Sequence, residues 1–109
     1  MKAIVLAALL AASSSAHAVT VGCPPLSGGM PLARTDGAAL YLGDPAANVE
    51  LIPSNPGGVN TWVLPKRGAV TIVCAYEGGG SRIALQVPPG IQVCRQTLPT
   101  NAPPTLACN

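Results

Sequence analysis

The sequence predicts a small all-β domain, mainly an antiparallel meander that forms a small sandwich or a partly open barrel, with two disulfides. Three observations predict it. Residues 69–98 alternate between apolar and polar side chains with the period of a strand. All 12 prolines and 12 glycines fall within residues 19–109, a density that favours short strands and turns over long helices. Four cysteines in so short a chain are typical of a disulfide-stabilised exported domain.

The first 18 residues have the organisation of a signal peptide. Lys2 supplies a positive charge, residues 3–12 are apolar, and Ala16-His17-Ala18 is a small-x-small cleavage site. A helix needs roughly 20 apolar residues to cross a bilayer, so this run is too short to remain as an anchor. We therefore expect a cleaved signal peptide at residues 1–18 and one domain at residues 19–109. The mature protein would be periplasmic or secreted, with no membrane span.

Signals between Cys23 and residue 69 are weaker. Prolines and glycines make residues 24–31 an irregular lead-in. Strands are expected at residues 38–43 and 61–64, and turns at residues 44–45 and 54–58. Residues 46–51 fit either one helical turn or a short strand.

The meander is expected at residues 70–77, 82–87 and 91–98, joined by a glycine-rich turn and by Pro88-Pro89-Gly90. In the first hairpin a single register places all the apolar side chains on one face, and a slip by one residue would invert a strand. The expected cross-strand pairs are Tyr76 with Ile83, Cys74 with Leu85, and Ile72 with Val87. Ile91 and Val93 then continue the apolar face, which leaves Cys94 on the opposite face from Cys74.

This facing argument orders the possible disulfides. It disfavours a Cys74–Cys94 bridge, and the turn-rich segment after Cys94 can return the last strand beside the third. The favoured pairing is Cys23–Cys74 with Cys94–Cys108, and the other two connectivities stay open. The four cysteines form no C-x-x-C motif, so their spacing does not match that of a redox motif or a zinc site.

Charge and residue types exclude several functions. Without Lys2, five basic residues face four acidic ones, a balance too even to indicate nucleic acid or an anionic membrane as partner. The single histidine, His17, lies in the expected leader. The mature chain thus lacks Ser-His and Cys-His pairs and histidine metal ligands, so we expect no catalytic residue, no metal site and no cofactor.

A series of short motifs covers most of residues 23–108. They are Cys23-Pro24, Leu51-Ile52-Pro53, a strand centred on Trp62, Val73-Cys74-Ala75-Tyr76, Val87-Pro88-Pro89-Gly90 with Cys94, and Leu106-Ala107-Cys108. In the order of these motifs the chain resembles a family of small exported bacterial proteins of unknown function that is known only by a locus-tag name. It departs from that family around Tyr76, where a more polar or basic strand is usual. The resemblance implies export, a β-rich fold and paired cysteines, and it supplies no substrate.

Four residues are candidate binding positions. Trp62 and Tyr41 could offer aromatic surface to a sugar or a protein, although an aromatic residue in a chain without phenylalanine more often anchors the core. Glu77 and Arg82 flank the glycine turn, where a solvated pair is the ordinary interpretation. Glu77 with Asp36, Asp44 or Glu50 would be needed for a carboxylate-based hydrolase, but these residues are distant in sequence.

The leading hypothesis is a non-enzymatic module that acts through its surface. A protein partner from the envelope or the exterior is favoured, because a core of this size should leave little room for a cavity of several hundred cubic ångströms. One version is a hydrolase inhibitor that presents residues 77–82 or 87–91 as a rigid loop. The alternatives are a structural component of an envelope assembly, with exposed strand edges, and, less favoured, the carboxylate hydrolase.

Overall fold

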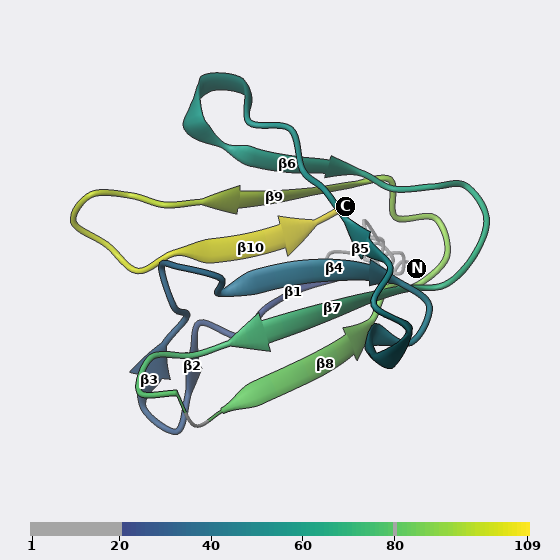
Figure 1. The fold of residues 1–109 in the computed structure, drawn as a ribbon. Helices are drawn as coiled ribbons and strands as arrows, with labels where there is room; N and C mark the ends of the chain where they lie inside the picture. The colour runs from purple at the N-terminus through teal and green to yellow at the C-terminus, as the bar shows by residue number, and fades with distance from the viewer. Residues whose placement is uncertain (1–20, 80) are drawn as a thin grey trace, which may run out of the picture.

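The computed structural model describes residues 21–79 and 81–109 (Figure 1). The expected signal peptide, residues 1–18, lies outside the described residues. The described chain forms β-strands and two short 3-10 helices, so the prediction of an all-β fold is confirmed. None of its helical segments is long and apolar enough to cross a bilayer. The elements are β1 (Val21–Gly22), β2 (Leu26–Ser27), β3 (Met30–Pro31), β4 (Ala38–Leu42), η2 (Pro45–Ala47), β5 (Glu50–Leu51), η3 (Pro56–Gly58), β6 (Asn60–Val63), β7 (Val70–Ala75), β8 (Arg82–Gln86), β9 (Val93–Thr97) and β10 (Thr105–Cys108).

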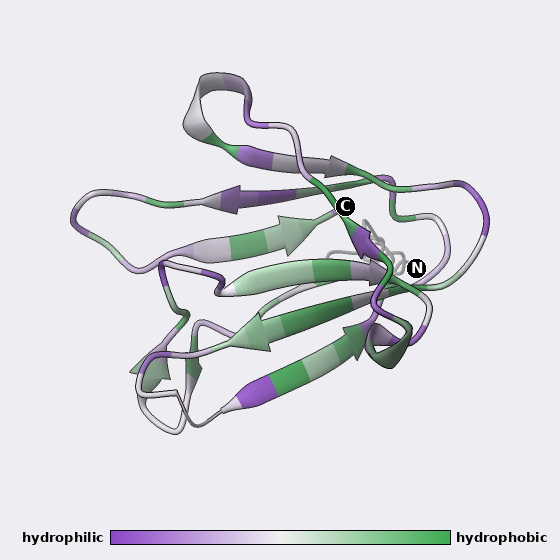
Figure 2. Cartoon of the chain, in the orientation of Figure 1, coloured by the Kyte–Doolittle hydropathy of each residue, from purple (hydrophilic) through white to green (hydrophobic). Residues whose placement is uncertain are grey.

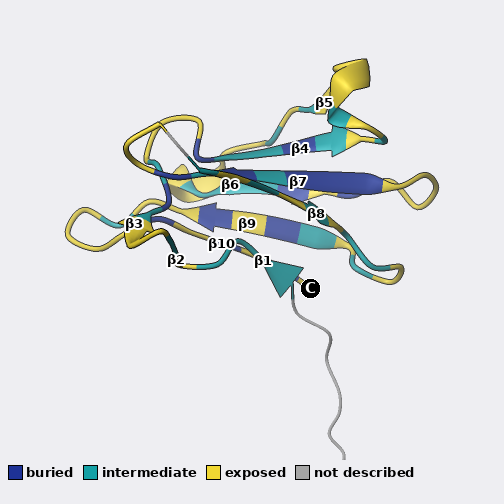
Figure 3. Ribbon diagram, turned by 90° about the horizontal axis from the view of Figure 1, so that it is seen from below, coloured by how far each residue is buried: buried dark blue, intermediate teal, exposed yellow. Residues whose placement is uncertain are grey.

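Two four-stranded antiparallel sheets make the body of the molecule. One has the strand order β1-β10-β9-β6 and the other β5-β4-β7-β8, while β2 and β3 form a separate hairpin. Seen from below, the two sheets lie as layers with their buried strands facing each other (Figure 3). The arrangement is a sandwich, the first of the two architectures that the sequence suggests.

The β7–β8 hairpin forms on the predicted residues, but its register differs from the prediction by two residues. Cys74 lies opposite Ile83 rather than Leu85, and the Tyr76 amide donates to the carbonyl of Ser81. A shift of two keeps every side chain on its face, so the apolar pattern could not distinguish the two registers. The turn decides it, because Gly78 and Gly79 adopt positive φ values and close the hairpin tightly.

The prediction was wrong about the position of the third strand of the meander. β9 does not pair with β8; it lies in the other sheet between β10 and β6. Pro89 and Gly90 do form a turn, but it lies within a connection that crosses from one sheet to the other and does not close a hairpin (Figure 1). Val93 therefore does not extend the apolar face of β7 and β8: it lies opposite Val63 in the second sheet.

Elsewhere the expected segments are found with small shifts. β4 and β6 fall on the two strands expected before residue 69. The ambiguous stretch at residues 46–51 contains both suggested structures, the end of η2 and then β5. Asp44 begins η2, and its carboxylate accepts a hydrogen bond from the Ala46 amide at 2.9 Å.

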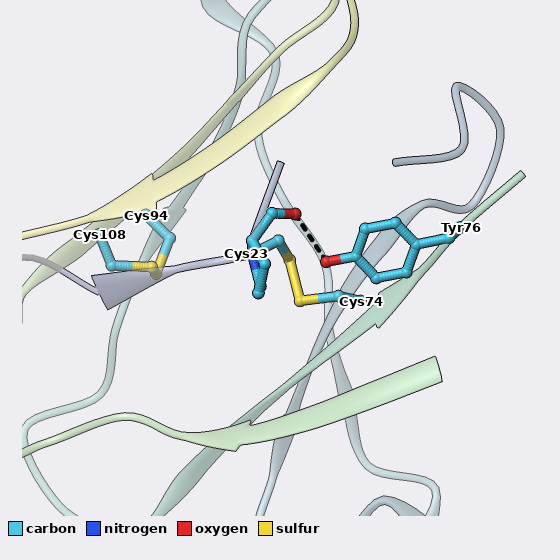
Figure 4. Close-up of a disulfide and its surroundings, with 6 residues drawn as sticks. Cys23, Cys74, Tyr76, Cys94 and Cys108 are labelled. Carbon is cyan, nitrogen blue, oxygen red and sulfur yellow. Dashed lines mark hydrogen bonds between the residues drawn. A yellow bond between two sulfur atoms is a disulfide. The ribbon is translucent and has the colours of Figure 1, made fainter. Parts of the chain in front are cut away.

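Both sheets contribute their inner faces to one core, and the two disulfides connect its parts. Cys23–Cys74 joins the start of the chain, next to β1, to β7 of the other sheet. Cys94–Cys108 joins the cross-strand neighbours of β9 and β10 (Figure 4). The favoured pairing is confirmed, but the reason differs from the one expected, because Cys74 and Cys94 belong to different sheets rather than to opposite faces of one. The buried apolar residues are Leu32, Leu40, Trp62, Leu64, Val70, Ile72, Cys74, Tyr76, Cys94, Leu106 and Cys108.

Candidate functional site

An apolar groove lies at one end of the sandwich. Two connections form it, the one from β6 to β7 and the one from β8 to β9, which run beside each other where the chain passes between the sheets (Figure 1). We call it the end groove. Its volume is about 670 Å³. Its lining consists of Val63, Leu64, Pro65, Lys66, Gly68, Ala69, Val70, Val87, Pro88, Pro89, Gly90, Ile91, Gln92 and Val93.

Backbone hydrogen bonds hold the two walls of the end groove together. The Leu64 amide donates to the Gln92 carbonyl at 2.8 Å, and the Val87 amide donates to the Val70 carbonyl at 2.9 Å. Three prolines in the lining fix their own φ angles and reduce the freedom of both walls further. The groove is therefore a preformed feature of the fold.

A gradient of burial runs across the end groove. Leu64 and Val70 are buried in the core, whereas Val63 at the rim is 78% exposed. The period of a strand explains the contrast, since Val63 alternates with the buried Trp62 and Leu64 and must face outward. An isolated exposed valine is ordinary, but this one stands beside a concave apolar surface.

The charge of the end groove is positive. Lys66 is the only charged side chain among the described residues of the lining, and none of these residues is acidic. Arg67 follows it and is exposed. Figure 2 shows the hydrophilic tip of the β6–β7 connection. A complementary ligand would be apolar with a negative group near Lys66.

A smaller hollow of about 280 Å³ lies at the other end of the sandwich, around the β7–β8 turn. Glu77, Arg82 and Asp36 all line it, so the fold brings together residues that the sequence separates widely. The Arg34 amide donates to Oε2 of Glu77 at 3.3 Å. The Arg34 guanidinium also donates to the carbonyls of Pro99 and Ala102, which ties this end to the β9–β10 connection.

This second hollow carries little chemistry. Both carboxylates belong to exposed residues, and no cluster of three or more potential metal ligands occurs within the residues that the structure describes. Asp44 and Glu50 do not line it. A pair of solvated carboxylates beside an arginine is an ordinary arrangement of charged side chains at an exposed turn.

The two remaining candidates lie elsewhere. Trp62 is 4% exposed and its indole N–H donates to the Leu51 carbonyl at 2.9 Å, so it anchors the core and offers almost no ring surface to a ligand. Tyr41 is half-buried on the outer face of β4, opposite Thr71 of β7 and Glu50 of β5. Neither borders the end groove.

Tyr76, which the sequence analysis placed on the apolar face of the hairpin, also makes a hydrogen bond that connects two parts of the chain. Its hydroxyl donates to the Pro24 carbonyl at 2.7 Å, next to the Cys23–Cys74 bridge (Figure 4). Burial raises the pKa of the Tyr76 phenol above its ordinary value. The bond and the bridge fasten the N-terminal segment to β7.

The sequence analysis named part of the end groove and missed the rest. It singled out residues 87–91 as a loop to be presented, and it gave no binding role to Lys66 or Arg67. It also expected that the core would leave little room for a cavity of several hundred cubic ångströms. The end groove lies between two connections at the surface and not inside the core. Val63 could have been found from its alternation with Trp62.

Fold and site together define a class. The protein is a small β-sandwich with two disulfides and an apolar groove between two of its connections. The chain belongs to the Type VI secretion system Tli immunity protein family, whose model matches residues 30–109. No curated protein and no solved structure matches the sequence.

Membership in this family corrects and sharpens the sequence interpretation. The chain is a small bacterial protein, as the resemblance implied, but the resemblance did not identify the immunity family. Immunity proteins are not enzymes, so the prediction of a non-enzymatic protein is confirmed and the carboxylate hydrolase is excluded. The two disulfides are consistent with an oxidising compartment.

Proposed function

We propose that this protein protects the cell that makes it by binding and inhibiting a cognate lipase effector of the Type VI secretion system in the periplasm. The binding is stoichiometric and involves no turnover. It corresponds to the hydrolase-inhibitor version of the sequence hypothesis, with the hydrolase being a lipase.

The family match over residues 30–109 carries this proposal. Two properties of the chain support it. The disulfides suit the periplasm, where an effector that attacks membrane lipids meets its substrate. A rigid domain with a preformed groove can bind a partner with little loss of conformational entropy, which favours tight inhibition.

A sibling-competition experiment tests the immunity function and does not require that the effector be identified. Recipient cells that lack this gene are mixed with the parental strain, whose secretion system is active. We expect the recipients to lose viability and to regain it when the gene is restored on a plasmid. A parental strain with an inactivated secretion system is the control, and equal survival against both attackers would contradict an immunity function.

A lipid analysis of the same mixtures tests the lipase part separately. Attacked recipients should accumulate free fatty acids and lysophospholipids, and cells that carry the restored gene should not. If the recipients die with intact phospholipids, the effector has another target, and the lipase assignment fails while the immunity function stands.

The compartment is tested by expressing the protein with and without residues 1–18. Protection should require the leader, because a cytoplasmic copy neither meets the effector nor forms its disulfides. Full protection by the leaderless chain would contradict a periplasmic site of action.

A further inference from the structure

We infer that the end groove and the adjoining edge of β6 are the effector-binding surface, and that they bind an extended apolar segment of the effector with a carboxylate near Lys66. This inference rests on the proposed immunity function and adds the location and the chemistry of the contact. Three independent features of the chain lead to it.

The first feature is the free edge of β6. β6 is the last strand of its sheet, and its Val63 is not hydrogen-bonded to β9 because the neighbouring residues, Trp62 and Leu64, supply the bonds on that side. The Val63 N–H and C=O therefore point away from the sheet. In residues 21–79 and 81–109, the edge is covered only at Thr61, which exchanges two backbone hydrogen bonds with Ser54 at 2.8 and 2.9 Å.

This edge is a site for strand addition. An extended peptide placed beside Val63 would pair with its outward-pointing N–H and C=O and add a strand to the sheet. Edge strands are usually protected by charges, prolines or bulges, because an unprotected edge pairs with other chains. Position 63 itself carries no charge, no proline and no bulge, and the Val63 side chain is largely exposed.

The second feature is the apolar surface on both sides of that edge. Among the residues that the structure describes, Ile52 and Val63 are the most exposed of the large apolar side chains, at 81% and 78%. Val63 lines the groove directly, and Ile52 lies two residues before Ser54, on the segment that bridges to β6. A peptide strand added at the edge would turn every second side chain toward this surface, so an apolar residue could enter the groove.

The third feature is charge. With Lys66 as the sole charge among the described lining residues and Arg67 adjacent, the groove favours a partner that is negative at this point. None of the described lining residues is acidic, and Glu77 and Asp36 are at the opposite end of the sandwich. A carboxylate on the effector segment would find an opposite charge here and no repulsion from the lining.

The test uses single variants of the full gene in the sibling-competition assay. Val63→Asp removes the apolar contact, Lys66→Glu reverses the charge, and Leu26→Asp is the matched control. Leu26 is also an exposed apolar residue, at 56%, but it lies on β2 and outside the groove. All three side chains are at the surface, so thermal unfolding temperatures should stay close to that of the wild type.

Loss of one apolar or charged contact at the centre of an interface typically weakens binding by about tenfold to a hundredfold. We therefore expect that Val63→Asp and Lys66→Glu each need at least about tenfold more protein for equal survival, whereas Leu26→Asp and Lys66→Arg protect fully. If Val63→Asp and Lys66→Glu protect like the wild type, the groove inference is overturned while the immunity function stands. A loss with Leu26→Asp as large as with Val63→Asp would overturn it as well.

A crosslinking experiment keeps the inference testable if Val63→Asp fails to fold. A photoreactive phenylalanine derivative at position 63, and at position 26 as control, is activated in recipients exposed to the active attacker. We expect one crosslinked protein at position 63, present only when the attacker's secretion system functions, and none at position 26. A crosslink to a second copy of this chain, or to its own residues 1–18, would assign the groove to that occupant and overturn the inference.

Discussion

Removing the two disulfides one at a time should separate their contributions to stability. The double variant Cys23→Ala/Cys74→Ala deletes the bridge between the two sheets, and Cys94→Ala/Cys108→Ala deletes the bridge between β9 and β10. Alanine is small enough to replace a buried half-cystine without overpacking. The two variants differ in the length of chain that each bridge closes.

The chain-entropy estimate gives different magnitudes. For the sequence separation of 51 between Cys23 and Cys74, the unfolded state loses entropy worth about 4 kcal/mol at 25 °C. For the separation of 14 between Cys94 and Cys108, the value is about 3 kcal/mol. The first variant also loosens the segment whose Pro24 carbonyl accepts the Tyr76 hydrogen bond, which adds about 1 kcal/mol. β9 and β10 remain paired over four residue pairs without their bridge.

Urea unfolding at 25 °C measures both losses, with the fluorescence of the single tryptophan as probe. Trp62 is buried, so its fluorescence should report the loss of the core. Because Trp62 is the cross-strand neighbour of Cys94, removing the Cys94–Cys108 bridge also changes the surroundings of the indole and with them the fluorescence amplitude. Midpoints and slopes are therefore compared rather than amplitudes, with circular dichroism as a second probe. We expect the larger loss in Cys23→Ala/Cys74→Ala. An equal or larger loss in Cys94→Ala/Cys108→Ala would refute the reasoning that the long, inter-sheet bridge contributes more.

Three further predictions concern single residues. Trp62→Phe leaves the Leu51 carbonyl without its donor and should lower the free energy of unfolding by about 1–3 kcal/mol in urea titrations followed by circular dichroism; an unchanged midpoint would contradict the role of this hydrogen bond. For Tyr76, the raised pKa means that the unfolded state releases the phenolic proton first, so stability is complete below pH 10 and declines as the pH rises through the raised pKa of the folded state. Tyr76→Phe should be less stable at neutral pH but lack this alkaline decline, and a decline of equal size in both proteins would assign it to other groups. Gly22→Ala places a Cβ against the Leu106 carbonyl oxygen and should separate β1 from β10, which thermal unfolding would register as a loss of about 1–3 kcal/mol; a thermal midpoint equal to that of the wild type would show that β1 moves without cost.

Local pattern was enough for the strands that are regular and self-contained. The alternation along residues 70–77 and 82–87 predicted a hairpin and assigned its side chains to the correct faces, because burial on one side imposes period two on the sequence itself. The predicted register was wrong by two residues. Both registers satisfy the apolar pattern, and only the closure of the turn distinguishes them.

The partner of β9 could not be read from the sequence. Its neighbours β6 and β10 belong to a different sheet from β8. The proline and glycine residues after Val87 are compatible with either a tight turn or a crossover between sheets. Cys94 and Gln96 of β9 are buried on the inner face of the second sheet. This packing places β9 in that sheet, and the chain after β8 must therefore cross over. The candidate site followed the same division: residues 87–91 were recognisable as a loop, but their apposition to residues 63–70 exists only in the folded chain.

The sequence by itself determined the β class, the four paired cysteines, the expectation of export and the lack of histidine chemistry, because each of these depends on composition or on short-range pattern. Only the tertiary structure decided which sheet each strand joins, and with it the end groove and the free edge at Val63. The physical reason is that strand pairing and groove formation depend on contacts between residues far apart in the chain, where many arrangements satisfy the same local preferences and only the packing of the whole core distinguishes them.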